Sequence, residues 1–233
     1  IFICVKEYSL DSVLPFIRRT AGPRTIIIPI LNIYGTGARM QKELPDWTVL
    51  DGCIYVSASL EHPGVLVQHG PILRVVFGPR DPSYISPILS AIQSDLCESG
   101  IDGVLSTHIQ RDALEKFSYV SPIGAAGVYL HAVAGDFQKE GPARELFKSM
   151  IREISALAAA MGYPFEKDYV KINLEILSNL SADATTSMQR DIMEGKPSEL
   201  DGLVMEPLRL AKKYSVSMPC YEEVAKVLCP SEF

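Results

Sequence analysis

The sequence predicts an α/β domain followed by an all-helical domain. Up to Ser106, buried-strand patterns such as Thr25–Leu31 alternate with helical ones, which is the order of a parallel α/β unit. After that point the apolar residues recur at the helical spacing of three and four. We therefore divide the chain into residues 1–106 and residues 107–233.

Composition narrows the class of protein. The chain has 233 residues, with 22 Lys and Arg against 28 Asp and Glu, so its net charge of −6 does not suit a nucleic-acid or anionic-membrane binder. Its apolar stretches, such as TIIIPIL, fall far short of the roughly 20 residues that span a bilayer. The five cysteines contain no CxxC pair, which argues against a disulfide framework or a zinc site. We expect a cytoplasmic protein with no nucleic-acid, membrane or metal partner.

Two consecutive strands at the start of the chain each end in a polar residue. Ile1–Val5 is wholly apolar and has neither a methionine nor a signal peptide before it, so we expect the printed sequence to begin inside a fold. A helix and a second buried strand, Thr25–Leu31, follow. Lys6 and Asn32 come directly after the two strands, where parallel α/β sheets bind their ligands. Either can equally be a loop residue bonded to water or to the backbone.

The segment after Asn32 superficially matches a dinucleotide fingerprint. Gly35-Thr36-Gly37 opens a GxGxxG pattern, but its sixth position is Met40. No acidic residue follows at the right distance on a next strand, since Asp51 is not expected at a strand end. A turn that enters a helix is the better interpretation.

Residues 48–78 predict a strand followed by an antiparallel hairpin or meander. Turn signals stand at His62-Pro63-Gly64 and at His69-Gly70-Pro71. A capped helix from Asp81 and a short strand, IDGVLST, then complete the α/β domain.

The helical domain opens with a long run, Thr107–Ala134, that contains Lys116 beside an apolar stripe. The lysine either extends its ammonium to solvent along that stripe, or it is partly desolvated and suited to proton transfer. Pro122 predicts a kink in this helix. The following small residues, Gly124–Gly127, allow another element to approach closely.

Three further helices and a final short one follow, separated by a polar loop, SADATTSMQRDIMEGKPSE. At the end of that loop, Ser198 and Asp201 fit a variant of the capping box, which places Glu199 in the first turn. The helix dipole favours an anion there. Capping does not by itself require Glu199.

Taken together, several segments resemble the ketopantoate reductases (2-dehydropantoate 2-reductases) in their order and spacing. The resemblance covers nearly the whole chain and is most specific in the TSMQRD…SE block with the lysine helix upstream. The segments are VKEYSLDSVLPFIR, IIPILN, GCIYVSA, LEKFSYVSPIGAAG, TTSMQRDIMEGKPSELDG and SVSMP. The resemblance implies an N-terminal Rossmann domain that binds NADPH, of which residues 1–106 are the C-terminal portion, and a helical domain, with ketopantoate held in the cleft.

The resemblance also implies which residues act on the substrate. Lys116 matches the lysine that donates a proton to the ketone. Asn32 matches an asparagine that touches both cofactor and substrate. Ser187 matches a serine that binds the carboxylate end of the substrate, and Glu199 matches the acid that positions the substrate or the cofactor ribose.

For the cofactor, the resemblance implies Lys6, Asn32, Ala58 through its backbone, and Glu199. The main phosphate-binding loop, with its GxGxxG, does not occur in this sequence, nor does the basic residue that would read the 2′-phosphate of NADP. We therefore expect the chain as printed to bind a dinucleotide poorly or not at all.

The sequence departs from the family pattern near the substrate. Asparagines that follow the lysine by one and two turns in the family are Val120 and Gly124 here, and an asparagine-glycine pair is Val204-Met205. These changes leave ketopantoate and other 2-oxo acids open as substrates. Two alternatives to a reductase of this family are a family-derived module that only binds a partner and an unrelated α/β dehydrogenase of the 6-phosphogluconate type. The long helices also allow a homodimer.

Overall fold

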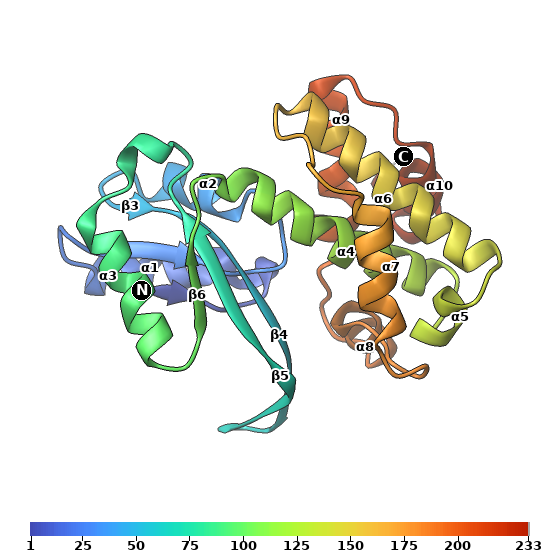
Figure 1. Ribbon diagram of the computed structural model, residues 1–233, viewed down its shortest axis with the longest axis horizontal. Coiled ribbons are helices and arrows are strands. Elements are labelled where there is room, and N and C mark those ends of the chain that lie inside the picture. Colours follow the sequence, from blue (N-terminus) through green and yellow to red (C-terminus); the bar gives the residue numbers. More distant parts are fainter. Residues whose placement is uncertain (233) are drawn as a thin grey trace. The chain divides into compact units, whose positions relative to one another are not determined.

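The computed structural model describes residues 1–232 and divides into two compact units, Ile1–Ala113 and Leu114–Phe233 (Figure 1). The division falls inside one helix, α4 (Ile109–Tyr129), so the first turn of α4 belongs to unit 1 and the remainder to unit 2. The predicted order of an α/β part followed by a helical part is confirmed. None of the helices in residues 1–232 has both the length and the apolarity needed to cross a bilayer.

Unit 1 begins with three short parallel strands in the order β1-β2-β3. They are β1 (Phe2–Ile3), β2 (Ile26–Pro29) and β3 (Thr48–Val49). A 3-10 helix (Glu7–Ser9), α1 (Leu10–Thr20) and α2 (Thr36–Glu43) connect them. Buried side chains of the strands and both helices form one apolar cluster, among them Ile3, Leu14, Ile17, Ile27 and Met40. Burial of this shared face explains why the apolar strands fold here with amphipathic helices.

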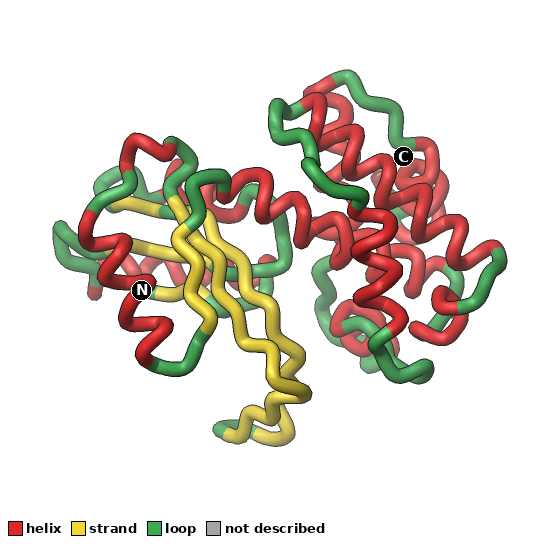
Figure 2. The backbone as a smooth tube through the Cα atoms, viewed as in Figure 1, coloured by secondary structure: helices red, strands yellow, loops and turns green. Residues whose placement is uncertain are grey.

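A second three-stranded sheet, in the order β4-β5-β6, completes unit 1. Its strands are β4 (Asp51–His62), β5 (Val65–Gly78) and β6 (Asp102–Leu105). β4 and β5 are antiparallel and β6 runs parallel to β5, after a 3-10 helix (Pro82–Tyr84) and α3 (Pro87–Glu98). The start of β4 and the end of β5 contain the buried residues of the hairpin. The half of the hairpin next to its turn is exposed and extends beyond the rest of the unit (Figure 2).

The chain turns only once within residues 48–78, so the hairpin prediction is right and the meander is wrong. The turn lies at Pro63-Gly64. The second predicted turn, around Gly70, is an irregularity within β5, because the register changes from Val56↔Leu73 to Ala58↔Gln68. Four residues of β5 therefore have no partner in the ladder, and Gly70 accommodates the distortion with a φ of +83°.

Unit 2 is wholly helical. After α4 come α5 (Ala134–Gln138), α6 (Pro142–Ala160), α7 (Tyr169–Ser178), α8 (Ser187–Met193), a π-helix (Asp201–Met205), α9 (Glu206–Tyr214), α10 (Pro219–Leu228) and a 3-10 helix (Pro230–Glu232). Two details differ from the prediction. The run Thr107–Ala134 is not one helix, because α4 ends at Tyr129. The segment predicted to be a polar loop contains a helix, α8.

Candidate functional site

Lys116 lies in the part of α4 that belongs to unit 2. Its side chain is partly buried and is engaged in an interaction within the chain, while its neighbours Leu114 and Phe117 are fully buried. Residues four and eleven positions later, Val120 and Gly127, fall on the same face of the helix. The elements that pack on that face determine which groups can contact Lys116.

Two other elements approach α4 on this face, at its small residues. A Cβ added to Gly124 would lie 3.2 Å from Met188 Cε of α8 and 3.7 Å from Leu203 Cδ1 of the π-helix. A Cβ added to Gly127 would lie 2.8 Å from the side chain of Gln189. The prediction that these small residues allow another element to approach closely is therefore confirmed. One of the two elements, α8, begins at Ser187, and the other, the π-helix, follows Glu199.

Ser187 is the first residue of α8 and is partly buried. Thr186 and Gln189 form a capping box in front of it: the Gln189 N–H donates to Thr186 Oγ1 at 3.2 Å, and the Thr186 N–H donates to Gln189 Oε1 at 2.9 Å. Gln189 Nε2 also donates to the Ala132 carbonyl at 2.7 Å. One glutamine thus fixes both the start of α8 and its attachment beyond the end of α4.

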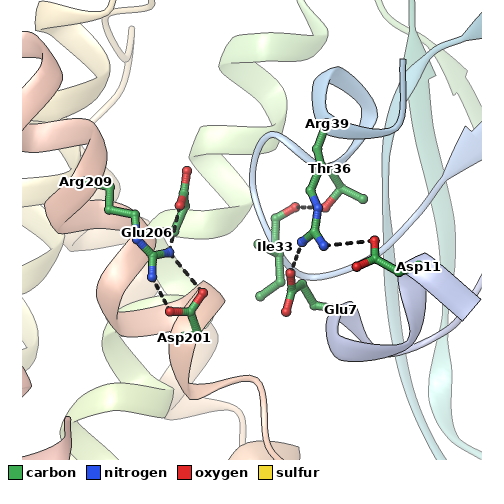
Figure 3. Close-up of polar contacts among 8 residues, drawn as sticks. All are labelled: Glu7, Asp11, Ile33, Thr36, Arg39, Asp201, Glu206 and Arg209. Carbon is green, nitrogen blue, oxygen red and sulfur yellow. Dashed lines mark hydrogen bonds and ion pairs between the residues drawn. The ribbon is translucent and has the colours of Figure 1, made fainter. Parts of the chain in front are cut away.

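Glu199 is only 3 % exposed and interacts within the chain. The helix begins at the next residue, and the Glu199 carbonyl accepts the Leu203 N–H at 2.9 Å. The predicted capping box does not describe this helix start, because the Asp201 carboxylate binds Arg209 of α9, with one contact of 2.9 Å (Figure 3). The hydrogen bonds that Arg209 donates to Asp201 and to Glu206 raise the pKa of Arg209.

Sequence reasoning missed two features of unit 2 close to these residues. The first is the π-helix Asp201–Met205, a rare conformation that often occurs at functional sites. The second is Tyr119, three residues after Lys116, whose buried hydroxyl has no hydrogen-bond partner among the described residues. Burial raises the pKa of Tyr119 to about 12, and its ring packs edge-on against Phe147. Neither feature has a clear signal in the local sequence.

In unit 1, Lys6 and Asn32 lie at corresponding places after adjacent strands. Ile3 of β1 pairs with Pro29 of β2. Lys6 lies three positions after Ile3, and Asn32 lies three positions after Pro29. Both side chains are partly buried and interact within the chain. Because β1 and β2 are parallel, the two residues lie at the same edge of the sheet, where ligands of such sheets bind.

An ion-pair cluster joins the segments that follow these two residues. Arg39 of α2 binds the carboxylates of Glu7 and Asp11, the second at 3.2 Å (Figure 3). Glu7 is the residue after Lys6, and α2 begins four residues after Asn32. The cluster therefore fixes the two loops of this sheet edge to one another.

The Gly35-Thr36-Gly37 turn enters α2, as the sequence analysis favoured. Gly35 is the residue before the helix and has a φ of +80°. A Cβ on Gly37 would lie 2.0 Å from Asp51 Oδ1, so glycine is required there by a carboxylate of the protein itself. The place that a phosphate would take in a dinucleotide fingerprint is filled, and this turn does not fit a pyrophosphate.

Asp51 is the centre of a buried hydrogen-bond network in unit 1. It is 8 % exposed and accepts hydrogen bonds from Arg80 at 3.2 Å and from Gln110 at 2.8 Å. Gln110 in turn accepts the Tyr34 hydroxyl at 2.6 Å. Burial raises the pKa of Asp51, whereas Arg80, Gln110 and the Gly37 N–H act in the opposite direction.

Ala58 is exposed in β4 and pairs with Gln68, next to the irregular part of β5. The adjacent Ser59 Oγ lies 2.9 Å from His69 Nε2. The six predicted site residues thus fall into two sets: Lys6, Asn32 and Ala58 in unit 1, and Lys116, Ser187 and Glu199 in unit 2. No group of three or more His, Cys, Asp or Glu in residues 1–232 is arranged to hold a metal ion.

Comparisons with known proteins agree on one family. Residues 108–230 match the family model described as ketopantoate reductase PanE/ApbA C terminal, and residues 1–82 match the model ketopantoate reductase PanE/ApbA. The 2-dehydropantoate 2-reductase of Aquifex aeolicus is 24 % identical over 236 residues, which cover 100 % of this chain and 76 % of that protein.

Solved structures give the same result for the fold. A dimeric ketopantoate reductase from Staphylococcus aureus has a TM-score of 0.84 at 22 % identity, with 98 % of this chain and 75 % of that chain covered. A D-mandelate dehydrogenase in complex with NADH has a TM-score of 0.86 at 19 % identity, with 100 % and 78 % covered.

Proposed function

Since the chain belongs to the ketopantoate reductase family, we propose that it reduces ketopantoate, or a related 2-oxo acid, to the corresponding 2-hydroxy acid. With ketopantoate the product is pantoate, a precursor of pantothenate and coenzyme A. The observation that carries the proposal is the meeting of α8 and the π-helix on the Lys116 face of α4, at Gly124. α8, which begins at Ser187, and the π-helix, which follows Glu199, thus pack against the helix that carries Lys116.

Lys116 is the proton donor in this proposal. Reduction of a ketone places negative charge on its oxygen, so an ammonium within hydrogen-bond reach stabilises the transition state and then supplies the proton. NADPH, when bound, supplies the hydride. Partial burial of Lys116 suits this role, because electrostatic interactions are stronger away from bulk water.

The remaining residues bind and orient. Ser187 and Asn32 contact the substrate, with Ser187 at its carboxylate end. Glu199 positions the substrate or the cofactor ribose. Lys6, Asn32, Glu199 and the backbone of Ala58 would hold the dinucleotide. Correct orientation of the reacting groups accounts for a large part of such catalysis.

The structural support for a dinucleotide site comes from one edge of the first sheet. The carboxyl edge of β1 and β2 offers a cation, Lys6, and an amide, Asn32, which suit a nucleotide phosphate and polar ring substituents. The turn at Gly37 offers no phosphate site. We propose NADPH as the cofactor, and a homodimer as the assembly, because of the family.

The identity of the 2-oxo acid depends on the face of α4 beyond Lys116. Val120 is apolar, and Gly124 lies against Met188 and Leu203, so this face offers little hydrogen bonding to a substrate side chain. Assays with ketopantoate and with 2-oxo acids that have apolar side chains distinguish the candidates. The higher kcat/KM identifies the preferred class.

The decisive experiment is ketopantoate-dependent oxidation of NADPH by the purified protein. Lys116→Ala should lower kcat by about 10²- to 10⁴-fold, because a general acid contributes roughly that much, while the fold is retained. Lys148→Ala is the matched control, since Lys148 forms an ion pair with Glu145 on the surface of α6. Near-normal turnover of Lys116→Ala would remove this lysine from the mechanism. Absence of turnover with every 2-oxo acid in the wild type would favour a non-catalytic, partner-binding module.

A further inference from the structure

A buried series of hydrogen bonds joins the helix of Lys116 to the helix that follows Glu199. Ser121 Oγ of α4 lies 2.6 Å from the Leu203 carbonyl oxygen and 2.5 Å from the Tyr221 hydroxyl. Both Ser121 and Tyr221 are 0 % exposed. The carbonyl can only accept, so the single Ser121 hydrogen goes to Leu203, and Tyr221 donates to Ser121.

Pro207 removes one possible donor for the Leu203 carbonyl. In an α-helix that carbonyl would accept the N–H of residue 207, four positions later. Proline has no N–H, and a buried carbonyl without a donor is unfavourable. Ser121 supplies a donor from α4. The N–H of the same residue, Leu203, donates to the Glu199 carbonyl at 2.9 Å.

The same device occurs a second time on α4. Pro122 leaves the Ser118 carbonyl without its helical donor, and Asn173 Nδ2 of α7 donates to this carbonyl at 3.0 Å. Asn173 is 1 % exposed, so this bond is also buried. The stretch of α4 just after Lys116 is therefore fixed by α7 on one side and by the π-helix on another.

Tyr221 is itself held in place. It lies at the start of α10, where the Glu153 carboxylate of α6 accepts the Cys220 N–H at 2.8 Å and the Tyr221 N–H at 3.1 Å. Burial raises the pKa of Tyr221, with the Ser121 bond acting in the opposite direction and Glu153 adding to the rise. The hydroxyl therefore keeps its proton and remains a donor to Ser121.

We propose that Ser121 is a positioning residue, which fixes Glu199 relative to Lys116 through the backbone of Leu203. Ser121 and Lys116 are five residues apart on α4, and Leu203 follows Glu199 by four residues. Loss of the Ser121 hydroxyl frees the Leu203 carbonyl to seek another donor and shifts the backbone that carries Glu199. The consequence for substrate binding rests on the proposed function, whereas the coupling is a property of unit 2 alone.

The test compares Ser121→Ala with Ser155→Ala in the full protein. Ser155 donates at 2.9 Å to the Ile151 carbonyl of its own helix, so its loss removes a similar bond without affecting Glu199. Calorimetry with ketopantoate measures affinity, and amide hydrogen exchange at Leu203 reports on the bond from its N–H to the Glu199 carbonyl. Ser121→Ala should weaken binding on the order of tenfold and accelerate exchange at Leu203, because a small misplacement of a binding group has a large effect. Ser121→Cys, nearly isosteric with a weak donor, should fall between.

Equal affinity in the two alanine variants would overturn the proposal, even with faster exchange at Leu203. If the wild type binds no ketopantoate, the proposed function fails, and the carboxyl carbon resonance of Glu199 decides the coupling. A change of that resonance in Ser121→Ala but not in Ser155→Ala supports the proposal, and an unchanged resonance rejects it. Should Ser121→Ala not fold, Ser121→Cys is judged by the same readouts, because it keeps the size of the side chain and weakens the bond to Leu203.

Discussion

Single residues in this protein are constrained most strongly where a backbone approaches a buried charge. At Gly37, the first carbon of any side chain would meet Asp51 Oδ1 at 2.0 Å and the Leu50 carbonyl at 2.3 Å. Neither atom belongs to a flexible side-chain end, since Asp51 is bonded to Arg80 and Gln110. The start of α2 and the start of β4 can therefore be this close only with glycine between them.

Gly37→Ala should lower the free energy of unfolding by at least about 3 kcal/mol, because the packed surroundings must shift to admit the methyl group. Urea unfolding followed by circular dichroism measures the loss. Gly22→Ala serves as the control, since its Cβ would meet only Thr25 Oγ1, at 4.0 Å, and its effect should stay within about 0.5 kcal/mol. Equal stability of the two variants would show that the Gly37 contact relaxes easily.

At the scale of elements, local signals were enough to predict most of the architecture. The order of buried strands and helices predicted the parallel part of unit 1, and helical spacing predicted α4 and α6. The start of α8 was also readable, because Thr186 and Gln189 have the spacing of a capping box. The many polar residues around it favoured the prediction of a loop instead.

The π-helix could not be predicted in this way. Its Leu203 carbonyl is bonded to Ser121, and the two residues are 82 positions apart in the chain. Local propensity contains no information on such a partner. The candidate site has the same limitation: Lys6 and Asn32 follow from strand ends, whereas Ser187 and Ala58 came only from resemblance to a family.

The buried Asp51 carboxylate of β4 contacts α2 at Gly37 and the first turn of α4 at Gln110, so the packing of these three elements depends on pH. Burial raises the pKa of Asp51, so the folded protein binds this proton more readily than the unfolded chain. The free energy of unfolding then decreases as pH rises from the unfolded pKa through the folded pKa. Arg80 opposes this effect by stabilising the charged form.

Arg80→Ala should therefore lower stability by about 2 to 3 kcal/mol at neutral pH, where a charged Asp51 loses its partner. The loss should shrink as the pH falls through the raised pKa of Asp51, because the carboxyl group then takes up a proton. Urea unfolding at neutral pH and at a pH below that pKa measures the difference. Arg74→Ala provides the comparison, since its ion pair with Asp102, at 3.5 Å, is exposed and should contribute little at either pH. An Arg80→Ala loss that does not change with pH would contradict the argument.

At the scale of the whole molecule, the sequence and the structure place the boundary between the two units at different residues. The sequence placed it between residues 106 and 107, and the division by contacts falls after Ala113. The intervening residues begin α4, yet several of them bond to unit 1. Gln110 bonds to Tyr34 and to Asp51, and the Ser106 hydroxyl donates to Asp112 at 2.5 Å.

Two fragments of unit 1 test which boundary is the physical one. The fragment 1–113 keeps Ile109, which is 1 % exposed and packs with Cys53 and Val76, whereas the fragment 1–106 loses it. Burial of one such side chain contributes about 1.5 to 3 kcal/mol, so 1–113 should be the more stable fragment by at least that amount in urea unfolding. Ile109→Ala within 1–113 should remove much of the difference. Equal midpoints for 1–106 and 1–113 would instead place the boundary where the sequence predicted it, with α4 contributing to unit 2 alone.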